Sequence, residues 1–152
     1  MSPSARLADL GLALPDVVPP LAAYVPASRV GDLVFTAGQV PMRDGTLMNV
    51  GKVGADVSEA DAHACARQCA LNALAAAASV AGGLDAIQQV VKVAVYVAST
   101  PDFTGQPAVA NGASELLGAV FGDAGQHARS AVGAVSLPLD APVEVELVVR
   151  VA

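Results

Sequence analysis

The sequence predicts an α+β protein, in which a mixed sheet carries two main helices on one of its faces. Val-rich runs alternate with Ala-rich runs, which indicates that strands and helices alternate along the chain. The expected order of elements is β, β, long α, β, α, β, β, and two helices cover only one face of such a sheet. The length of 152 residues favours a single domain, with residues 1–20 as an N-terminal helix and a Pro-rich arm.

The first forty residues are expected to form a helix, an extended arm and a hairpin. Ser4–Leu10 forms the helix, with Ser4 as its N-cap. The prolines of Leu14–Leu21 keep that segment extended, because a proline disfavours helix for the residue before it. Ala22–Val30 and Leu33–Gln39 then form two strands with a two-residue turn between them.

Two helices are predicted from their caps and from their composition. The longer one follows Ser58, whose side chain can cap it, and ends at Gly82-Gly83. It is so rich in Ala that it must pack closely against a flat surface. The second helix covers about Pro107–Phe121 and ends at Gly122.

Three strands are predicted in the second half of the chain. Val90–Ala98 is the first of them, and alternation is expected to put Val91, Val93, Val95 and Val97 on one face. Arg129–Ser136 and Val143–Val151 are interpreted as a closing hairpin, because a turn with Pro and Asp separates them. A hairpin of this length does not by itself bring Arg129 into contact with the carboxylates of the second strand.

The sheet face without helices is expected to be buried in an oligomer. The residues assigned to that face are small or apolar, and a large exposed surface of this kind marks an interface. They include Thr36, Gly38, Ala94, Tyr96 and the small residues of 129–136. The pattern therefore predicts a closed homo-oligomer with the sheets in its interior.

Charge and hydropathy exclude several classes of protein. The net charge is −6 and no cluster of Lys or Arg occurs, which argues against a protein that binds duplex DNA or RNA. One arginine that holds a small anionic substrate remains compatible with this balance. No stretch approaches the length and apolarity of a membrane span, and no signal peptide is evident, so we expect a cytoplasmic protein without membrane partners.

The cysteines and histidines do not indicate a metal site. Cys65 and Cys69 are four residues apart on the long helix, which is a poor spacing for a disulfide. His63 lies near them, but no second pair of ligands follows elsewhere. We interpret both cysteines as small hydrophobic residues on a buried helix face, and His63 and His127 as surface residues.

Several segments are informative through their order and spacing: Phe35-Thr-Ala-Gly-Gln-Val-Pro41, Val90-Val-Lys-Val-Ala-Val-Tyr96, Asp102-Phe103 with Asn111, Ala128-Arg-Ser130, Leu137-Pro138 and Val143-Glu-Val-Glu146. In these segments the chain resembles the Rid family, the YjgF-like group of reactive-intermediate deaminases that is also called endoribonuclease L-PSP-like. The resemblance covers nearly the whole chain after about residue 20. It implies a chorismate-mutase-like fold and a homotrimer whose sheets line a central barrel, with clefts between the subunits.

The resemblance also implies a set of site residues. The arginine that binds the substrate carboxylate corresponds to Arg129, and the glutamate that holds the attacking water corresponds to Glu144, fifteen residues later. The backbone amide that helps to bind substrate corresponds to Gly38. Tyr24 and Asn111 correspond to two further substrate-binding positions. The chain departs from the usual family pattern around Tyr24, at His127 in place of Pro, and at Ala131, where Cys is frequent.

The residue types suit hydrolysis of an imine. A guanidinium binds a carboxylate bidentately and stays charged at any working pH. A glutamate orients water or acts as its general base, and a glycine lets the backbone approach the substrate. We therefore expect a deaminase of small 2-imino or enamino acids that gives a 2-keto acid and ammonia, with Arg129 and Glu144 as catalytic residues and no metal or organic cofactor.

Other interpretations of the same residues remain open. Arg129 is also compatible with a structural ion pair, Glu144 with a solvated strand face, and Gly38 with a bulge. Tyr24 is equally compatible with packing at an interface, and Asn111 with a capping role. The alternative function is a non-catalytic trimer that binds keto or amino acids. A ribonuclease ranks last, because the chain lacks a basic groove and paired catalytic histidines.

Overall fold

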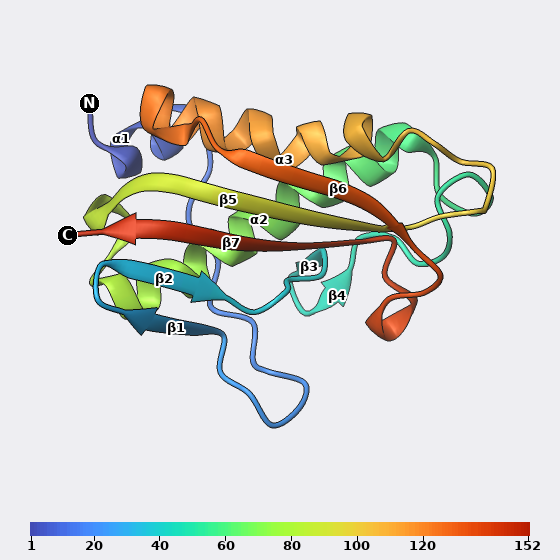
Figure 1. The fold of residues 1–152 in the computed structure, drawn as a ribbon, viewed down its shortest axis with the longest axis horizontal. Helices are drawn as coiled ribbons and strands as arrows, with labels where there is room; N and C mark the ends of the chain where they lie inside the picture. The colour runs from blue at the N-terminus through green and yellow to red at the C-terminus, as the bar shows by residue number, and fades with distance from the viewer.

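The computed structural model describes residues 1–152, and its centre is a five-stranded mixed sheet with the strand order β1-β2-β7-β5-β6 (Figure 1). Only β5 and β6 are parallel; the other neighbouring strands are antiparallel. The mixed sheet of the predicted fold class is thus confirmed. The strands are β1 (Ala27–Val30), β2 (Leu33–Thr36), β5 (Ile87–Ala98), β6 (Ala128–Ala134) and β7 (Val143–Val151).

Two long helices lie side by side on one face of this sheet, behind it in Figure 1. They are α2 (Glu59–Ala81) and α3 (Gln106–Phe121). The predicted caps of α2 are confirmed: Ser58 Oγ accepts a hydrogen bond from Asp61 N at 3.1 Å, and Gly82 ends the helix with a positive φ of 94°. No helix of the chain is long and apolar enough to cross a membrane.

The shorter elements lie at the periphery. A two-stranded sheet follows β2, and single turns of 3₁₀ helix precede β5, β6 and β7. These elements are α1 (Pro3–Asp9), β3 (Met42–Arg43), β4 (Thr46–Leu47), η1 (Leu84–Ala86), η2 (Gly122–Gly125) and η3 (Pro138–Asp140).

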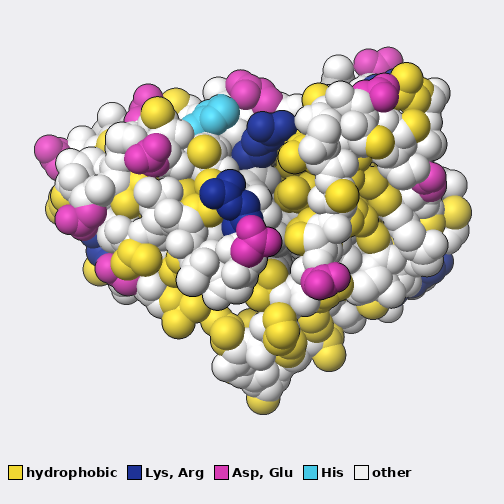
Figure 2. All heavy atoms as spheres, turned by 180° about the vertical axis from the view of Figure 1, so that it is seen from behind, with side chains coloured by type: hydrophobic (Ala, Val, Ile, Leu, Met, Phe, Trp, Pro, Cys, Tyr) yellow, Lys and Arg dark blue, Asp and Glu magenta, His cyan; other side chains and the backbone are white.

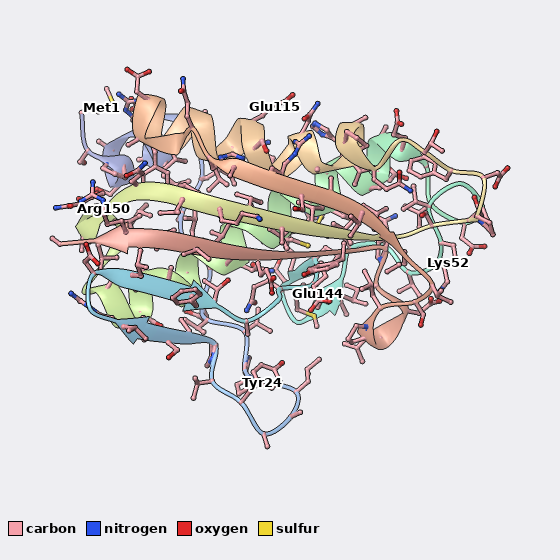
Figure 3. All side chains as sticks on the ribbon, viewed as in Figure 1. Met1, Tyr24, Lys52, Glu115, Glu144 and Arg150 are labelled. Carbon is pink, nitrogen blue, oxygen red and sulfur yellow. The ribbon has the colours of Figure 1, made fainter.

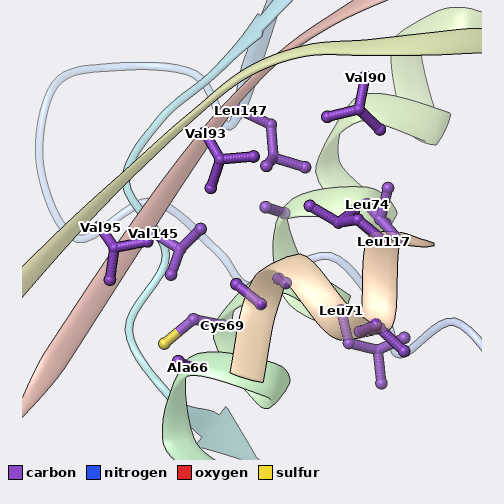
Figure 4. Packing of buried hydrophobic residues seen from close by; sticks show 14 of the residues in the cluster. Ala66, Cys69, Leu71, Leu74, Val90, Val93, Val95, Leu117, Val145 and Leu147 are labelled. Carbon is purple, nitrogen blue, oxygen red and sulfur yellow. The ribbon is translucent and has the colours of Figure 1, made fainter. Parts of the chain in front are cut away.

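The core between the sheet and the helices is built mainly from Val, Leu and Ala (Figure 4). Val93, Val95 and Val145 project from the sheet and are fully buried, while Leu74 and Leu117 meet them from α2 and α3. Cys65 and Cys69 are also buried and unpaired, as the sequence indicated. The many alanines of α2 allow this helix to lie close to both the sheet and α3.

The backbones of the two helices approach each other closely at Gly112 of α3. A Cβ atom there would collide with the backbone carbonyl of His63, lying 2.9 Å from its carbonyl carbon, and would be 3.3 Å from Arg67 N. Backbone atoms of a packed helix cannot move aside cheaply. Glycine at this position therefore sets the distance between α2 and α3.

We expect Gly112→Ala to lower the free energy of unfolding by about 1–3 kcal/mol, because overpacking outweighs the better helix propensity of alanine. Gly118→Ala on the same helix is the control, since a Cβ there meets nothing within 4 Å. The control should raise stability by about 0.5–1 kcal/mol. Urea unfolding of both variants measures the difference, and equal stabilities would contradict the proposed close approach.

The predicted closing hairpin is wrong. β6 and β7 are not neighbours, because β5 lies between them and pairs with both. The β5–α3–β6 segment is a parallel crossover, which needs an intervening helix, and α3 supplies it. Periodicity identified both strands but contained no information about their partners.

Three smaller expectations also need correction. The first strand begins at Ala27 rather than Ala22, and residues 22–26 form a loop. The N-cap of α1 is Ser2, while Ser4 binds Asp85 through its N–H (2.8 Å) and its Oγ (2.7 Å). Val91 is 37% exposed and Val90 is buried in its place, because a register shift interrupts the β5–β7 ladder between Val90 and Lys92.

The sheet face opposite the helices is uncovered and carries apolar side chains, as expected. Phe35 is 45% exposed and Val132 is 46% exposed, and both lie on this face. Phe35, together with Lys92, Ala94 and Tyr96, lines a hollow of about 340 Å³ above the sheet.

Candidate active site

Arg129 lies on the helix side of the sheet, at the outer edge of β6. It is paired with Val93 of β5, whose side chain points into the core, so the arginine leaves the same face. Its Nη1 donates to Asn111 Oδ1 at 2.8 Å and to Ser114 Oγ at 3.2 Å, both on α3. Arg129 and Asn111, two of the predicted site residues, are thus in direct contact.

The guanidinium of Arg129 is not neutralised by a carboxylate. The ion pairs of the chain are Lys52 with Asp140 and His63 with Glu115. Apart from Asn111 and Ser114, Arg129 contacts only the carbonyl of Pro107, through a long hydrogen bond of 3.5 Å from Nη2. Arg129 is half-buried and its Nε–H donates no hydrogen bond within the chain, which leaves that donor unused.

Tyr24, Gly38 and Glu144 line a second site, a small hollow of about 40 Å³. This volume is enough for a water molecule. Tyr24 lies on the loop before β1, and its hydroxyl accepts a hydrogen bond from Leu21 N at 3.2 Å (Figure 3). Pro138 and Gln39 also border the hollow.

Gly38 lies directly against the side chain of Glu144. A Cβ on Gly38 would collide with Glu144 Oε1 and would be 2.7 Å from its Cδ. The contact is fixed by two hydrogen bonds between Gln39 and Val145, of 2.8 and 3.0 Å, and by Asn72 Nδ2, which donates to Val40 O at 3.1 Å. The N–H of Gly38 has no hydrogen-bond partner within the chain and is free for a ligand.

The environment of Glu144 disfavours its charge. Burial, followed by the neighbouring carboxylate of Glu146, raises the pKa of Glu144 above its ordinary value. Glu146 in turn accepts a hydrogen bond from Tyr96 Oη at 3.1 Å. A carboxylate with a raised pKa beside a water-sized hollow has the properties of a general base.

A single copy of the chain does not bring Arg129 and Glu144 together. Glu144 is paired with Tyr96, and Arg129 with Val93, and these two residues of β5 point to opposite faces of the sheet. The five predicted residues therefore form two groups. Arg129 and Asn111 lie on the helix side, and Tyr24, Gly38 and Glu144 belong to the other group.

Comparison with known proteins identifies the family. Residues 4–151 match the family model described as "YjgF/chorismate mutase-like, putative endoribonuclease". The chain belongs to the YjgF family. A Trypanosoma cruzi protein named TCP17 is 40% identical over 148 residues, which is 97% of this chain and 92% of that protein.

Two solved structures of bacterial proteins are also similar to this YjgF-family chain. A protein of unknown function from Agrobacterium tumefaciens is 42% identical, with a TM-score of 0.90 over 99% of this chain and 92% of the other. A protein from Shewanella oneidensis, described as a putative endoribonuclease, is 33% identical, with a TM-score of 0.96 over 99% and 100%.

The sequence did not reveal two residues of the Arg129 group. Ser114 contacts the guanidinium directly, but a serine within a helix gives no signal of such a role. His127, expected at the surface, is half-buried: its Nε2 is 2.9 Å from Ser114 Oγ and its Nδ1 is 2.6 Å from Gly125 O. Its position two residues before Arg129 in a strand-like segment was the available hint.

The largest hollow of this YjgF-family chain lies elsewhere. It measures about 500 Å³ and lies at the ends of β5 and β6, between Lys52, Phe103 and Gln106. None of the five predicted site residues lines it. Size alone therefore does not point to the predicted site residues, and the unpaired guanidinium and the half-buried carboxylate are better guides.

We expect Glu144→Gln to stabilise the protein at pH 7. With a raised pKa, the native state binds more protons than the unfolded state, so wild-type stability falls as the pH rises from about 4.3 through that raised value. The amide carries no charge, so Tm should be higher than that of the wild type at pH 7. This gain should vanish below about pH 4, where both states of the wild type are protonated.

Scanning calorimetry at pH 4 and pH 7 measures this effect. Glu115→Gln serves as the control, because Glu115 is exposed on α3 and its pair with His63 contributes little. A Glu144→Gln protein that is less stable than wild type at pH 7 would contradict the assigned cost of the buried charge.

Proposed function

We propose that the chain is a cytoplasmic, cofactor-free hydrolytic deaminase that acts on small 2-imino or enamino acids. The observation that carries this proposal is the pair of separated half-sites. One half-site has the guanidinium of Arg129, which forms no ion pair with a carboxylate. The other has the carboxylate of Glu144, whose pKa is raised, beside the unbonded backbone N–H of Gly38. These are the groups needed to hold a carboxylate and to activate a water molecule.

We also propose that a homotrimer completes the site, with the uncovered sheet faces lining a central barrel. The exposed Phe35 and Val132 support burial of that face by other copies. In such a ring, Arg129 and Asn111 of one copy face Tyr24, Gly38 and Glu144 of the next. A heterologous contact of this kind repeats the same site at each interface.

The proposed reaction adds water to the imine carbon. Arg129 binds the substrate carboxylate, the Gly38 N–H helps to orient it, and Glu144 accepts a proton from the attacking water. Attack on the protonated imine gives a neutral carbinolamine, and Glu144 returns its proton to the nitrogen. As the C–N bond breaks, the hydroxyl proton passes by way of Glu144 to the departing ammonia, so that ammonium and a 2-keto acid leave. One water is consumed for each imine, and no electron acceptor is needed.

The charge distribution gives no support to the ribonuclease described for some relatives. The net charge is −6, and the face in Figure 2 shows one small central group of basic side chains with acidic ones beside it, and otherwise only scattered basic atoms at its margins. A backbone-binding groove for RNA needs several clustered cations. We therefore expect neither RNA cleavage nor salt-dependent RNA binding.

Subunit complementation tests this proposal most sharply. At 2-iminopropionate concentrations well below KM, generated in the assay by an amino acid oxidase, the Arg129→Ala and Glu144→Ala proteins should each retain only about 1% of wild-type activity or less. When the two are unfolded together and refolded as mixed trimers, about a quarter of the interfaces should combine an intact Arg129 with an intact Glu144. Activity should return to about that fraction of wild type.

Each outcome separates the alternatives. Mixed oligomers without activity, or a monomer by light scattering, would overturn the inter-subunit site. A wild-type protein that binds pyruvate but releases no ammonia from the imine would be the non-catalytic binding trimer. The refolded mixture of Arg129→Ala with an Arg129→Ala, Glu144→Ala double variant is the control, because none of its interfaces contains an intact Arg129.

A further inference from the structure

A chain of hydrogen bonds leads from the guanidinium of Arg129 into the protein. It passes from Arg129 Nη1 to Ser114 Oγ (3.2 Å), from Ser114 Oγ to His127 Nε2 (2.9 Å), and from His127 Nδ1 to Gly125 O (2.6 Å). We propose that Ser114 and His127 are positioning residues that hold Arg129 in the orientation that binds the substrate carboxylate. This inference rests on the proposed function of Arg129.

For a neutral His127 ring, the donors and acceptors in this chain of hydrogen bonds have one consistent assignment. The carbonyl of Gly125 only accepts, so Nδ1 of His127 carries a proton. Nε2 of the neutral ring is then an acceptor, and the hydroxyl of Ser114 donates to it. The lone pairs of Ser114 Oγ are thereby turned toward Arg129, whose guanidinium can only donate.

The chain of hydrogen bonds contacts only one end of the guanidinium, at Nη1. Both hydrogens of Nη1 are used, one by Asn111 Oδ1 and one by Ser114 Oγ. The Nε–H and the facing hydrogen of Nη2 remain available, and together they form a two-pronged edge that suits a carboxylate. Fixing Nη1 therefore orients the free edge and lowers the entropy that binding would otherwise cost.

His127 supplies a rigid support for this arrangement. It is half-buried and its ring is held at both nitrogens, at one end by the backbone and at the other by α3. Without His127, the hydroxyl of Ser114 could adopt several rotamers. The acceptor at His127 Nε2 selects the orientation in which the lone pairs of Ser114 Oγ face Arg129. The role of His127 is thus indirect, through Ser114, while Ser114 contacts the guanidinium.

Matched variants at Ser114 test the role of the hydroxyl. Ser114→Val and Ser114→Thr have the same shape, and only threonine keeps the hydroxyl. We expect Ser114→Val to raise KM for 2-iminopropionate and Kd for pyruvate by about 3- to 10-fold with kcat nearly unchanged. Ser114→Thr should stay within about twofold of wild type. Equal values for both variants would overturn the proposal.

The histidine is tested with a double-mutant cycle. His127→Ala should raise KM as Ser114→Val does, and the double variant should be no worse than Ser114→Val alone, because both act through one hydrogen bond. His63→Ala, at the other histidine, is the control and should leave KM unchanged. Additive effects at Ser114 and His127, or a loss confined to kcat, would contradict a positioning role.

A readout without catalysis separates this inference from the proposed function. In ¹⁵N NMR spectra of the wild-type protein, His127 should show a protonated Nδ1, and rotation of the Arg129 Nη1 group should be slow. Ser114→Val should make that rotation fast. A wild type without turnover but with these signals would refute the deaminase and retain the positioning chain. If the Arg129 Nη1 group rotated at the same rate in the wild type and in Ser114→Val, the positioning role of Ser114 and His127 would be refuted, whatever the activity.

Discussion

Arg129→Ala is expected to lower kcat/KM for 2-iminopropionate by about 10²–10³-fold, because two charge-assisted hydrogen bonds to the substrate carboxylate are lost. Most of this loss should appear in KM and in the Kd for pyruvate, since the carboxylate is bound equally in the ground state and in the transition state. Isothermal titration with pyruvate and an ammonia-release assay measure the two quantities.

Arg129→Lys distinguishes bidentate binding from charge alone. Lysine keeps the charge but has no planar fork, so it should recover only a small part of the lost affinity. The single ammonium group of lysine also cannot donate to Asn111 and Ser114 and still present two further donors to the substrate carboxylate. Arg29→Ala is the control, because Arg29 is an exposed residue of β1 that binds only the carbonyls of Gly31 and Ala152.

Two results would contradict the role of Arg129. Full activity of Arg129→Lys would mean that a point charge is sufficient. Full activity of Arg129→Ala would remove the guanidinium from the reaction altogether. Since Arg129 has no carboxylate partner in the chain, its removal should leave the free energy of unfolding within about 1 kcal/mol of wild type, so lost activity would not reflect unfolding.

The helices and most strand positions were predictable because their signals are local. Ser58 and Gly82 mark the two ends of α2 through side-chain capping and through a left-handed backbone, and both effects depend on one or two residues. The alternation of Val143, Val145 and Leu147 likewise follows from the geometry of a strand. Such signals require no knowledge of distant parts of the chain.

Strand partners and site geometry were not predictable in this way. The insertion of β5 between β6 and β7 depends on the path of α3 over the sheet, which periodicity does not encode. The same insertion explains why Arg129 and Glu144 leave opposite faces, a relation that their spacing in the sequence conceals. Family resemblance supplied the residues, and the strand register supports the proposal that two copies share the site.

Gly38→Ala should abolish most activity with little loss of stability. The new Cβ would collide with Glu144 Oε1, and the flexible carboxylate, rather than the backbone, has to move. The φ angle of Gly38 is not in the left-handed region, so alanine is tolerated by the backbone itself. We expect kcat to fall by about 10²-fold or more, the scale of a lost general base.

The free energy of unfolding provides the second half of this prediction. A displaced Glu144 is better solvated, which relieves the cost of its buried charge, so Gly38→Ala should lie within about 1 kcal/mol of wild type. Pyruvate affinity should change little, because Arg129 is untouched. A variant that unfolds readily would instead show that Gly38 is a structural glycine. Normal turnover would show that the position of the Glu144 carboxylate does not matter, and the proposed catalytic role of that residue would then fail.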